Sequence, residues 1–255
     1  MPEVDARGVR LQYVERAGPG EPILFVHGHH GTHHAWDGVI RALPPAHHAL
    51  AVDLRGSGGS DKPAVGYAPA DYAGDLRHAA DALGIGPFTL VGYSLGGVAA
   101  VETALEEPER IRRLVLVAVA ALDGLSPDRP PPQHPRPSRA TRRAGLVSMM
   151  ARSLSESVIE QLLDDEESWT REASQGAIEG LRPLHLGRRL HELRMPSMVV
   201  VGDRDRLLPS NRSAAALLPD ARLQVYTDAS HLLPMERPAE LAALIDEFMA
   251  SSPGH

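Results

Sequence analysis

The sequence predicts an α/β fold in which a mostly parallel, doubly wound sheet carries a helical insertion. Short continuous apolar runs, typical of strands buried on both faces, alternate with longer segments whose apolar residues recur at helical spacing. The alternation breaks between about residues 122 and 194, which predicts an insertion between two strands. A chain of 255 residues, 43% of them hydrophobic, is long enough for one large domain of this kind.

The expected elements follow one another in regular order. An initial antiparallel strand is expected at residues 11–15. The apolar runs that predict the remaining strands are residues 23–26, 50–52, 88–91, 114–119, 198–201 and 223–226. The helices expected between and after these strands are residues 36–43, 69–83, 98–106, 210–217 and 236–249. Because strand–helix–strand connections join parallel strands, this order predicts a parallel sheet with helices on both faces.

The segment that interrupts the alternation begins with a proline-rich stretch. Its prolines, in residues 126–137, predict an extended or mobile link rather than a helix. Amphipathic helical spacing follows in residues 141–152, 155–163 and 166–178, and residues 192–196 return the chain to the sheet. The predicted division is a first core segment (1–121), a helical cap (122–194) and a second core segment (195–255).

The composition excludes several classes of protein. The net charge of −7, without a long basic run, argues against a nucleic-acid partner. The absence of cysteine excludes disulfides, a thiolate nucleophile and sulfur-ligated metals. No basic and apolar leader stands at the start, and no apolar stretch approaches the roughly 20 residues that span a bilayer. We therefore expect a cytoplasmic monomer or homodimer that needs no cofactor and no membrane.

The most informative motif is Gly92-Tyr93-Ser94-Leu95-Gly96, which lies between an apolar run and an alanine-rich helical stretch. A serine between glycines at a strand–helix junction is typical of a nucleophile elbow, whose tight turn tolerates only small flanking residues. The helix N-terminus beneath Ser94 would favour a developing negative charge. Taken alone, the motif also fits a serine in an ordinary glycine-rich turn, so the rest of the chain must decide.

A base and an acid that could activate Ser94 follow later strands. The candidate base is His231, after the last predicted strand. The candidate acid is Asp205, after the strand at 198–201, with Asp203 as the competing choice and Asp123 as a third. Open α/β sheets place their sites at the carboxyl ends of strands, and the order serine, acid, histidine suits this architecture. The sequence therefore predicts a Ser–His–Asp catalytic triad.

Donors for an oxyanion are expected from two backbone N–H groups. One belongs to Leu95, directly after the serine, and the other to His29, where Gly28 lets the loop after the strand at 23–26 bend toward Ser94. The neighbouring residues that we expect to bind the substrate are His30, Tyr93 and Leu232.

With these motifs the chain resembles the α/β-hydrolase superfamily over nearly its whole length. The motifs that carry the resemblance are His27-Gly28 with Gly31 and Trp36, residues 53–60, Gly92 to Gly97, Gly202 to Pro209, and His231 with Glu236 and Pro238. The family pattern puts the acid third after its glycine, which favours Asp205 over Asp203. The resemblance also implies a cap inserted after the sixth strand, where residues 122–194 fall.

Two other groupings suggest different chemistry. His27, His29 and His30 are similar to the start of a metallo-hydrolase signature, but no aspartate precedes a third histidine, so we expect no metal site. His33 and His34 are expected to begin the helix and to face solvent or the pocket. Residues 56–60 lack the lysine of a phosphate loop and are interpreted as a flexible turn.

The function predicted from the sequence is hydrolysis of a small carboxylic ester or lactone through an acyl-enzyme on Ser94. Dehalogenases and epoxide hydrolases of the superfamily use an aspartate at the elbow, so the serine argues against both. Two alternatives stay open. One is a non-catalytic small-molecule receptor on the same fold, and the other is an enzyme that uses the triad for carbon–carbon bond hydrolysis or as a lyase.

Overall fold

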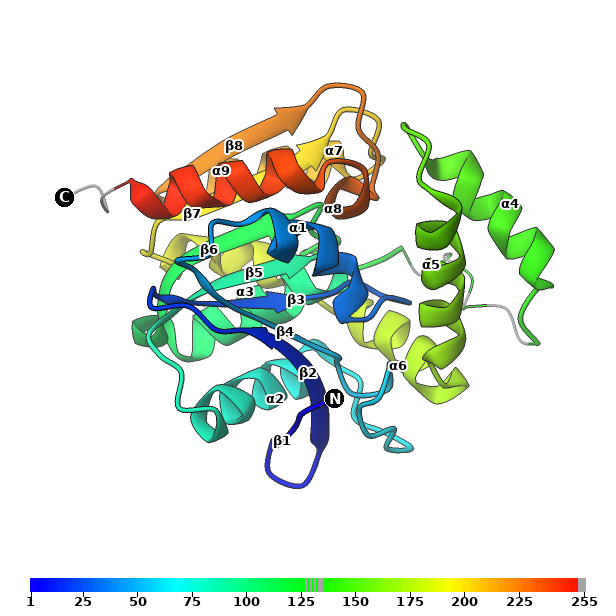
Figure 1. Ribbon diagram of the computed structural model, residues 1–255, viewed down its shortest axis with the longest axis horizontal. Helices are drawn as coiled ribbons and strands as arrows, with labels where there is room; N and C mark the ends of the chain where they lie inside the picture. The colour runs from blue at the N-terminus through cyan, green and yellow to red at the C-terminus, as the bar shows by residue number, and fades with distance from the viewer. Residues whose placement is uncertain (127, 129, 131, 133–134, 252–255) are drawn as a thin grey trace.

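The computed structural model describes residues 1–126, 128, 130, 132 and 135–251. In this part of the chain eight strands form one sheet in the order β1-β2-β4-β3-β5-β6-β7-β8 (Figure 1). The strands are β1 (Glu3–Asp5), β2 (Arg10–Arg16), β3 (Pro22–Val26), β4 (His48–Val52), β5 (Phe88–Tyr93), β6 (Ile111–Val117), β7 (Ser197–Gly202) and β8 (Ala221–Tyr226). β1 pairs with β2, and β2 with β4, in antiparallel fashion, whereas all pairs from β4 to β8 are parallel.

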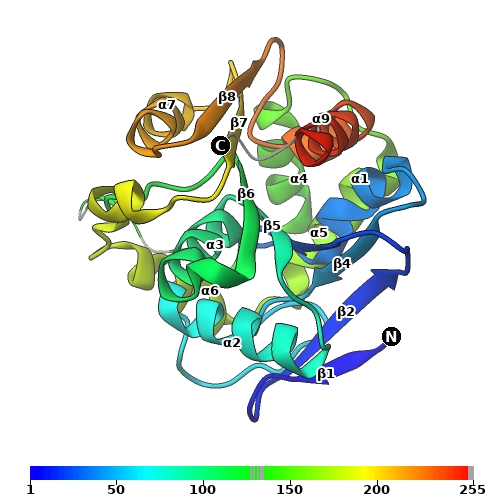
Figure 2. The ribbon, with the colours of Figure 1, turned by 90° about the vertical axis from the view of Figure 1, so that its left-hand side faces the viewer.

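Helices cover both faces of this sheet, as the end-on view shows (Figure 2). The core helices are α1 (Asp37–Ala42), α2 (Pro69–Ala82), α3 (Leu95–Glu106), α7 (Leu208–Leu217), α8 (Leu233–Glu236) and α9 (Pro238–Ala250), with 3₁₀ turns η1 (His33–Trp36) and η2 (Pro108–Arg110). Buried side chains of α2, α3 and α7 form one hydrophobic cluster with the sheet, and those of α1, α8 and α9 form another. Every residue of β5 and β7 is buried, which explains why these strands are mainly apolar in sequence.

The structure confirms the predicted α/β class with its mostly parallel, doubly wound sheet. Every predicted strand and core helix is present, with bounds that differ by a few residues. The short strand Glu3–Asp5 was not predicted, because only one of its three residues is buried and the pattern is too short to recognise. The helix predicted at 236–249 is α9, which begins at Pro238, and the short helix α8 precedes it and ends at Glu236.

The inserted segment contributes α4 (Arg139–Met149), α5 (Glu156–Ser168), α6 (Arg171–Leu181) and the 3₁₀ segment η3 (Leu186–Glu192) between β6 and β7. Helices α4 to α6 lie beyond the carboxyl ends of the parallel strands (Figure 1). The structure describes all residues of α4 and buries none of them, whereas α6 and η3 add side chains to the core of the sheet.

The domain bounds 122–194 stay a prediction. The proline-rich link predicted at 126–137 falls partly outside the described residues, at 127, 129, 131, 133 and 134.

The predicted break between the second and third inserted helices is wrong. A break was expected between residues 163 and 166, but α5 continues through the acidic run to Ser168. The chain leaves the helix at Trp169, which is extended (φ −72°, ψ 136°), and Thr170 caps α6 by accepting a hydrogen bond from the Ala173 N–H. Glu166 and Glu167 are good helix formers, and α5 continues until the cap signal at Thr170 begins α6.

Asn211 on α7 fixes the chain where it leaves β6. Its side chain is fully buried, and Oδ1 accepts from the Val119 N–H at 3.0 Å while Nδ2 donates to the Val119 carbonyl at 2.9 Å. Val119 packs against α3 so closely that a Cβ on Gly97 would lie 2.8 Å from its Cγ2. Asn211 therefore holds the segment that supports the start of α3.

We expect Asn211→Ala to lower the free energy of unfolding by about 2–4 kcal/mol, because two buried backbone groups lose their partner. Urea unfolding followed by circular dichroism measures this loss. Ser213→Ala on the same helix is the control, since its exposed hydroxyl bonds only to the Pro209 carbonyl and its loss should change stability by less than about 0.5 kcal/mol. Equal stabilities of the two variants would contradict the role given to Asn211.

Candidate active site

Ser94 lies in a sharp turn between β5 and α3. Its backbone has φ +52° and ψ −113°, a region that non-glycine residues seldom adopt and that costs about 1–3 kcal/mol. Hydrogen bonds on both sides maintain this conformation: the Ser94 N–H donates to the Val117 carbonyl, and the Ser94 carbonyl accepts from the N–H groups of Gly97, Val98 and Ala120. The strand–turn–helix that the sequence predicted at this serine is present.

The glycines around Ser94 are required by contact between backbones. A Cβ on Gly92 would lie 2.5 Å from the carbonyl oxygen of Gly96, and a Cβ on Gly96 would lie 2.4 Å from that of His27. Neither distance is possible for a real side chain, so β5, α3 and the loop after β3 can meet only through glycine. This close approach brings the histidine-rich loop beside Ser94.

Ser94, His231 and Asp205 form a continuous hydrogen-bonded row. The Nε2 atom of His231 lies 3.1 Å from Ser94 Oγ, and its Nδ1 atom lies 2.8 Å from Asp205 Oδ2. The Asp205 side chain is fully buried, whereas 30% of the His231 side chain is exposed. The carboxylate can therefore hold the imidazole in place while its other nitrogen faces the serine hydroxyl.

The two competing acids lie elsewhere. Asp203 is exposed, and its Oδ1 atom faces the Ala229 N–H at 3.4 Å. Asp123 is also exposed and lines a separate cavity with His185 and Gly187. In contrast, Asp205 is anchored further by the Leu207 N–H, which donates to its Oδ1 atom at 2.9 Å. The structure brings only Asp205 of these three to His231.

The loop His27–Gly31 lies against the serine. A Cβ on Gly28 would be 3.0 Å from the Ser94 Cβ atom, so the loop could not approach so closely with a larger residue. Leu95 is the first residue of α3, and its N–H therefore has no acceptor within the helix. That the N–H groups of His29 and Leu95 receive an oxyanion stays a prediction.

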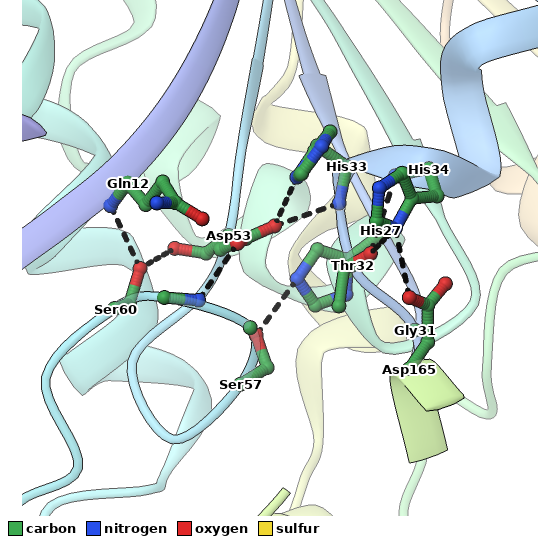
Figure 3. Close-up of polar contacts among 12 residues, drawn as sticks. Gln12, His27, Gly31, Thr32, His33, His34, Asp53, Ser57, Ser60 and Asp165 are labelled. Carbon is green, nitrogen blue, oxygen red and sulfur yellow. Dashed lines mark hydrogen bonds and ion pairs between the residues drawn. The ribbon is translucent and has the colours of Figure 1, made fainter. Parts of the chain in front are cut away.

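A buried carboxylate fixes the chain that follows this loop (Figure 3). Asp53 Oδ1 lies 2.8 Å from both the backbone N and the Nδ1 atom of His33, and Asp53 Oδ2 accepts from the Gly59 N–H. Burial alone would raise the pKa of Asp53, but the hydrogen bonds that it accepts from the ring and the backbone of His33 outweigh burial and lower the pKa to about 2. The expectation that His33 faces solvent or the pocket is wrong, because this pairing buries it.

His27 is held in one tautomer. The Leu54 N–H donates to its Nε2 atom at 2.9 Å, so Nε2 is unprotonated and Nδ1 donates to the Gly28 carbonyl at 2.8 Å. Burial lowers the pKa of His27, which keeps the ring neutral. Residues 56–60 were expected to be a flexible turn, and they follow two residues, Asp53 and Leu54, that bond to this loop, while the buried Ser57 contacts His27.

His29 and His30 join the loop to the inserted helix α6. Their rings stack with centroids 3.8 Å apart, and both Nε2 atoms face Ser174, with 2.7 Å between His30 Nε2 and Ser174 Oγ. Burial, followed by the nearby charges of His29, Arg136 and Arg142, lowers the pKa of His30 to about 2. In addition, the Trp169 indole N–H donates to the Gly31 carbonyl at 2.8 Å.

These contacts also bear on the metal hypothesis. The ring nitrogens of His27, His29 and His30 face the backbone or Ser174 rather than a common centre. Within the described ranges, no three His, Cys, Asp or Glu side chains gather as a metal site would require.

No helix in the described part of the chain combines the length and apolar character needed to span a bilayer.

A second pairing joins the core to α5. His34 Nδ1 lies 2.8 Å from Asp165 Oδ1, a carboxylate that is 2% exposed, and Gln161 Nε2 donates to the same oxygen (Figure 3 shows His34 and Asp165). This hydrogen bond raises the pKa of His34 above its usual value, so the charged form is favoured. This pairing cannot be recognised from the sequence, because 131 residues separate the partners.

A cavity of about 510 Å³ opens above Ser94 and His231. The substrate-binding residues predicted from the sequence, His30, Tyr93 and Leu232, all line it. The inserted helices contribute apolar residues and two charged ones that the sequence did not reveal, namely Leu146, Met149, Leu162, Leu163, Arg142 and Glu166. On an amphipathic helix, charges that face a cavity look the same in sequence as charges that face solvent.

Comparisons with known proteins agree with this architecture. The sequence profile described as the alpha/beta hydrolase family matches residues 23–244. A dihydrolipoyllysine-residue acetyltransferase component of the acetoin cleaving system from Cupriavidus necator is 29% identical, over 96% of this chain and 68% of that protein.

Among solved structures, Est816, an N-acyl homoserine lactone degrading enzyme, superposes with a TM-score of 0.79 at 25% identity, covering 97% of this chain and all of that one. An esterase from Exiguobacterium antarcticum reaches a TM-score of 0.84 at 18% identity, over 98% of this chain and 99% of its own, and this likeness shows the fold. The match of the family profile to most of the sequence, together with the sheet and its connections, shows that the chain belongs to the alpha/beta hydrolase family.

Proposed function

We propose that this protein is a serine hydrolase that cleaves small carboxylic esters or lactones through an acyl-enzyme on Ser94. The observation that carries the proposal is the row from Ser94 Oγ through His231 to the buried Asp205 carboxylate, which opens into the cavity. A volume of about 510 Å³ with mostly apolar walls suits a small organic substrate.

In the first step, Ser94 Oγ forms a bond to the substrate carbonyl carbon while His231 Nε2 takes the hydroxyl proton. The carbonyl π electrons move to the oxygen, and the N–H groups of His29 and Leu95 donate hydrogen bonds to the resulting oxyanion. Asp205 keeps the imidazole oriented and stabilises the imidazolium ion. The intermediate then collapses, the carbon–oxygen bond to the leaving group breaks, and His231 gives its proton to the departing alkoxide.

In the second step, water attacks the acyl-enzyme. His231 takes a proton from the water, a second tetrahedral intermediate forms, and its collapse returns the proton to Ser94 Oγ and releases the acid. With a lactone, the alcohol formed in the first step stays attached to the acyl chain, so a single hydroxy acid is released.

The choice of ester or lactone has two supports. The nucleophile is a serine, whereas the superfamily's epoxide hydrolases and dehalogenases need a carboxylate that can form an ester with the substrate. A lactone-degrading enzyme is also among the similar structures at 25% identity. Cleavage of a carbon–carbon bond needs the same three residues, so the discrimination depends on experiment rather than on the triad.

We expect Ser94→Ala to lower kcat for p-nitrophenyl acetate, butyrate or octanoate by about 10⁴-fold or more, because no other group can form the acyl-enzyme. Ser213→Ala, on the exposed side of α7, should keep wild-type turnover. Near-normal hydrolysis by Ser94→Ala would falsify the mechanism. Labelling of Ser94 by a fluorophosphonate without ester turnover would instead favour the receptor, and turnover without an acyl adduct would favour a lyase.

Asp205→Asn and Asp203→Asn form a matched pair that tests the acid. Asparagine at 205 can donate to His231 Nδ1 and so favours the wrong tautomer, and we expect kcat to fall by about 10⁴-fold. Asparagine at 203 keeps an oxygen for the Ala229 N–H, and kcat should stay within about twofold of wild type. A large loss in the 203 variant with activity retained in the 205 variant would assign the acid to Asp203.

A further inference from the structure

Glu236 is the last residue of α8, the short helix that follows the loop of His231. It belongs to the sequence motif of His231, Glu236 and Pro238, although the row from Ser94 through His231 to Asp205 is complete without it. Its side chain is half-buried, and four hydrogen-bond donors converge on its carboxylate. These donors come from two segments that are far apart in the sequence, so Glu236 joins two parts of the site.

The first two donors belong to Ser230, the residue before His231. The Ser230 N–H donates to Glu236 Oε2 at 2.8 Å, and the Ser230 hydroxyl donates to Oε1 at 2.9 Å. Ser230 is 2% exposed, so these bonds are shielded from water. The Leu232 N–H donates to the same hydroxyl oxygen at 3.0 Å, which ties the residue after the histidine to this serine as well. Glu236 thereby fixes the backbone from which the imidazole reaches Ser94.

The other two donors come from the loop between α4 and α5. The Ala151 N–H donates to Glu236 Oε1 at 2.7 Å, and the Arg152 N–H donates to the same oxygen at 3.3 Å. Just before this loop, Ser148 and Met149 at the end of α4 line the cavity above the serine. The carboxylate therefore holds the inserted segment at the point where it forms part of the cavity wall.

This contact matters because α4 buries none of its residues. The helix is joined to α5 by ion pairs such as that of Arg143 with Glu156, and exposed pairs of this kind contribute little. The loop after α4 meets the core through Glu236 and through Arg152, whose Nε atom lies 3.8 Å from Asp228 Oδ2. The hydrogen bond from Ala151 is much shorter than this ion pair, and an ionised acceptor strengthens it.

The residue type at position 236 suits this double contact. All four donors are neutral, being three backbone N–H groups and one hydroxyl. A carboxylate only accepts hydrogen bonds, so its two oxygens can serve both segments at once. A glutamine amide of the same shape would direct its own N–H groups at the donors of one segment.

We propose that Glu236 is a positioning residue that couples the orientation of His231 to the placement of α4 beside the cavity. It acts on the base through Ser230 and on the cavity wall through residues 151–152. The inference rests on the proposed function, since the orientation that it explains is the one that directs His231 at Ser94.

Two measurements separate the two sides of this coupling. The rate at which a small fluorophosphonate labels Ser94 reports on His231, and KM for p-nitrophenyl butyrate reports on the cavity wall. We expect Glu236→Ala to slow labelling by about tenfold and to raise KM by about fivefold, because it frees both the base and the wall. Glu240→Ala is the control, because this exposed residue on α9 pairs with Arg237, and both values should stay within about twofold of wild type.

Ala151→Pro removes one donor on the side of the insertion and leaves Ser230 unchanged. The preceding residue, Met150, is extended (φ −71°, ψ 136°), as a residue before proline should be. We expect KM to rise by about threefold while labelling keeps its wild-type rate. In a Glu236→Ala background the same proline should raise KM no further, because its acceptor is already gone; additive effects would overturn the coupling.

Glu236→Gln keeps the shape of the side chain and replaces Glu236→Ala if that variant does not fold. Its amide must face one of the two segments with a donor, so wild-type values of both labelling and KM would overturn the inference. If wild type hydrolyses no ester, the proposed function fails instead, and hydrogen–deuterium exchange still tests the coupling. Faster exchange of the Ser230 and Ala151 amides in Glu236→Ala, but not in Glu240→Ala, would support it; a wild-type rate at either amide would overturn it.

Discussion

The turn at Ser94 requires three chain segments to meet backbone to backbone, and most features around the site depend on this constraint. With φ at +52°, the serine stands between β5 and α3, and Gly92 and Gly96 leave no space that a Cβ could occupy. Because Gly96 touches the carbonyls of Val26 and His27, the loop after β3 has to lie beside the serine. One strained residue thus determines where the Ser94 hydroxyl and the neighbouring N–H groups stand.

The loop that meets this turn is itself held by buried polar groups. Asp53 fixes its far end through His33, and the neutral ring of His27 accepts a hydrogen bond from Leu54. These bonds are buried, so losing one partner leaves an unsatisfied group that costs about 1–3 kcal/mol. The same loop then contacts Ser174 and Trp169 of the insertion. The sheet therefore fixes the position of the loop, and the loop in turn fixes the position of the inserted helices that form the cavity wall.

The fold class and the hydrogen-bonded row of Ser94, His231 and Asp205 could be predicted from the sequence, because both leave short-range signals. Buried parallel strands give continuous apolar runs, and the turn at Ser94 gives glycines at fixed offsets. The long-range pairings gave no such signal. His33 and Asp53 are 20 residues apart, and His34 and Asp165 are 131 apart, so only the folded chain shows why these histidines are present. The extension of α5 to Ser168 was missed for a local reason, because the acidic run at residues 164–167 carries no apolar period.

Arg142 and Glu166 show why the insertion was the least predictable part of the site. A row of serine, histidine and carboxylate must reproduce one geometry, so its residue types are constrained, whereas a cavity wall can be built from any helices that reach it. α4 buries no residue in the core, and its sequence is therefore free of the packing demands that act on α3. Arg142 on this helix pairs with Glu166 and Glu167 of α5 instead of packing against the sheet. The sheet therefore carries Ser94 and His231, whereas the inserted helices form much of the wall of the cavity above them.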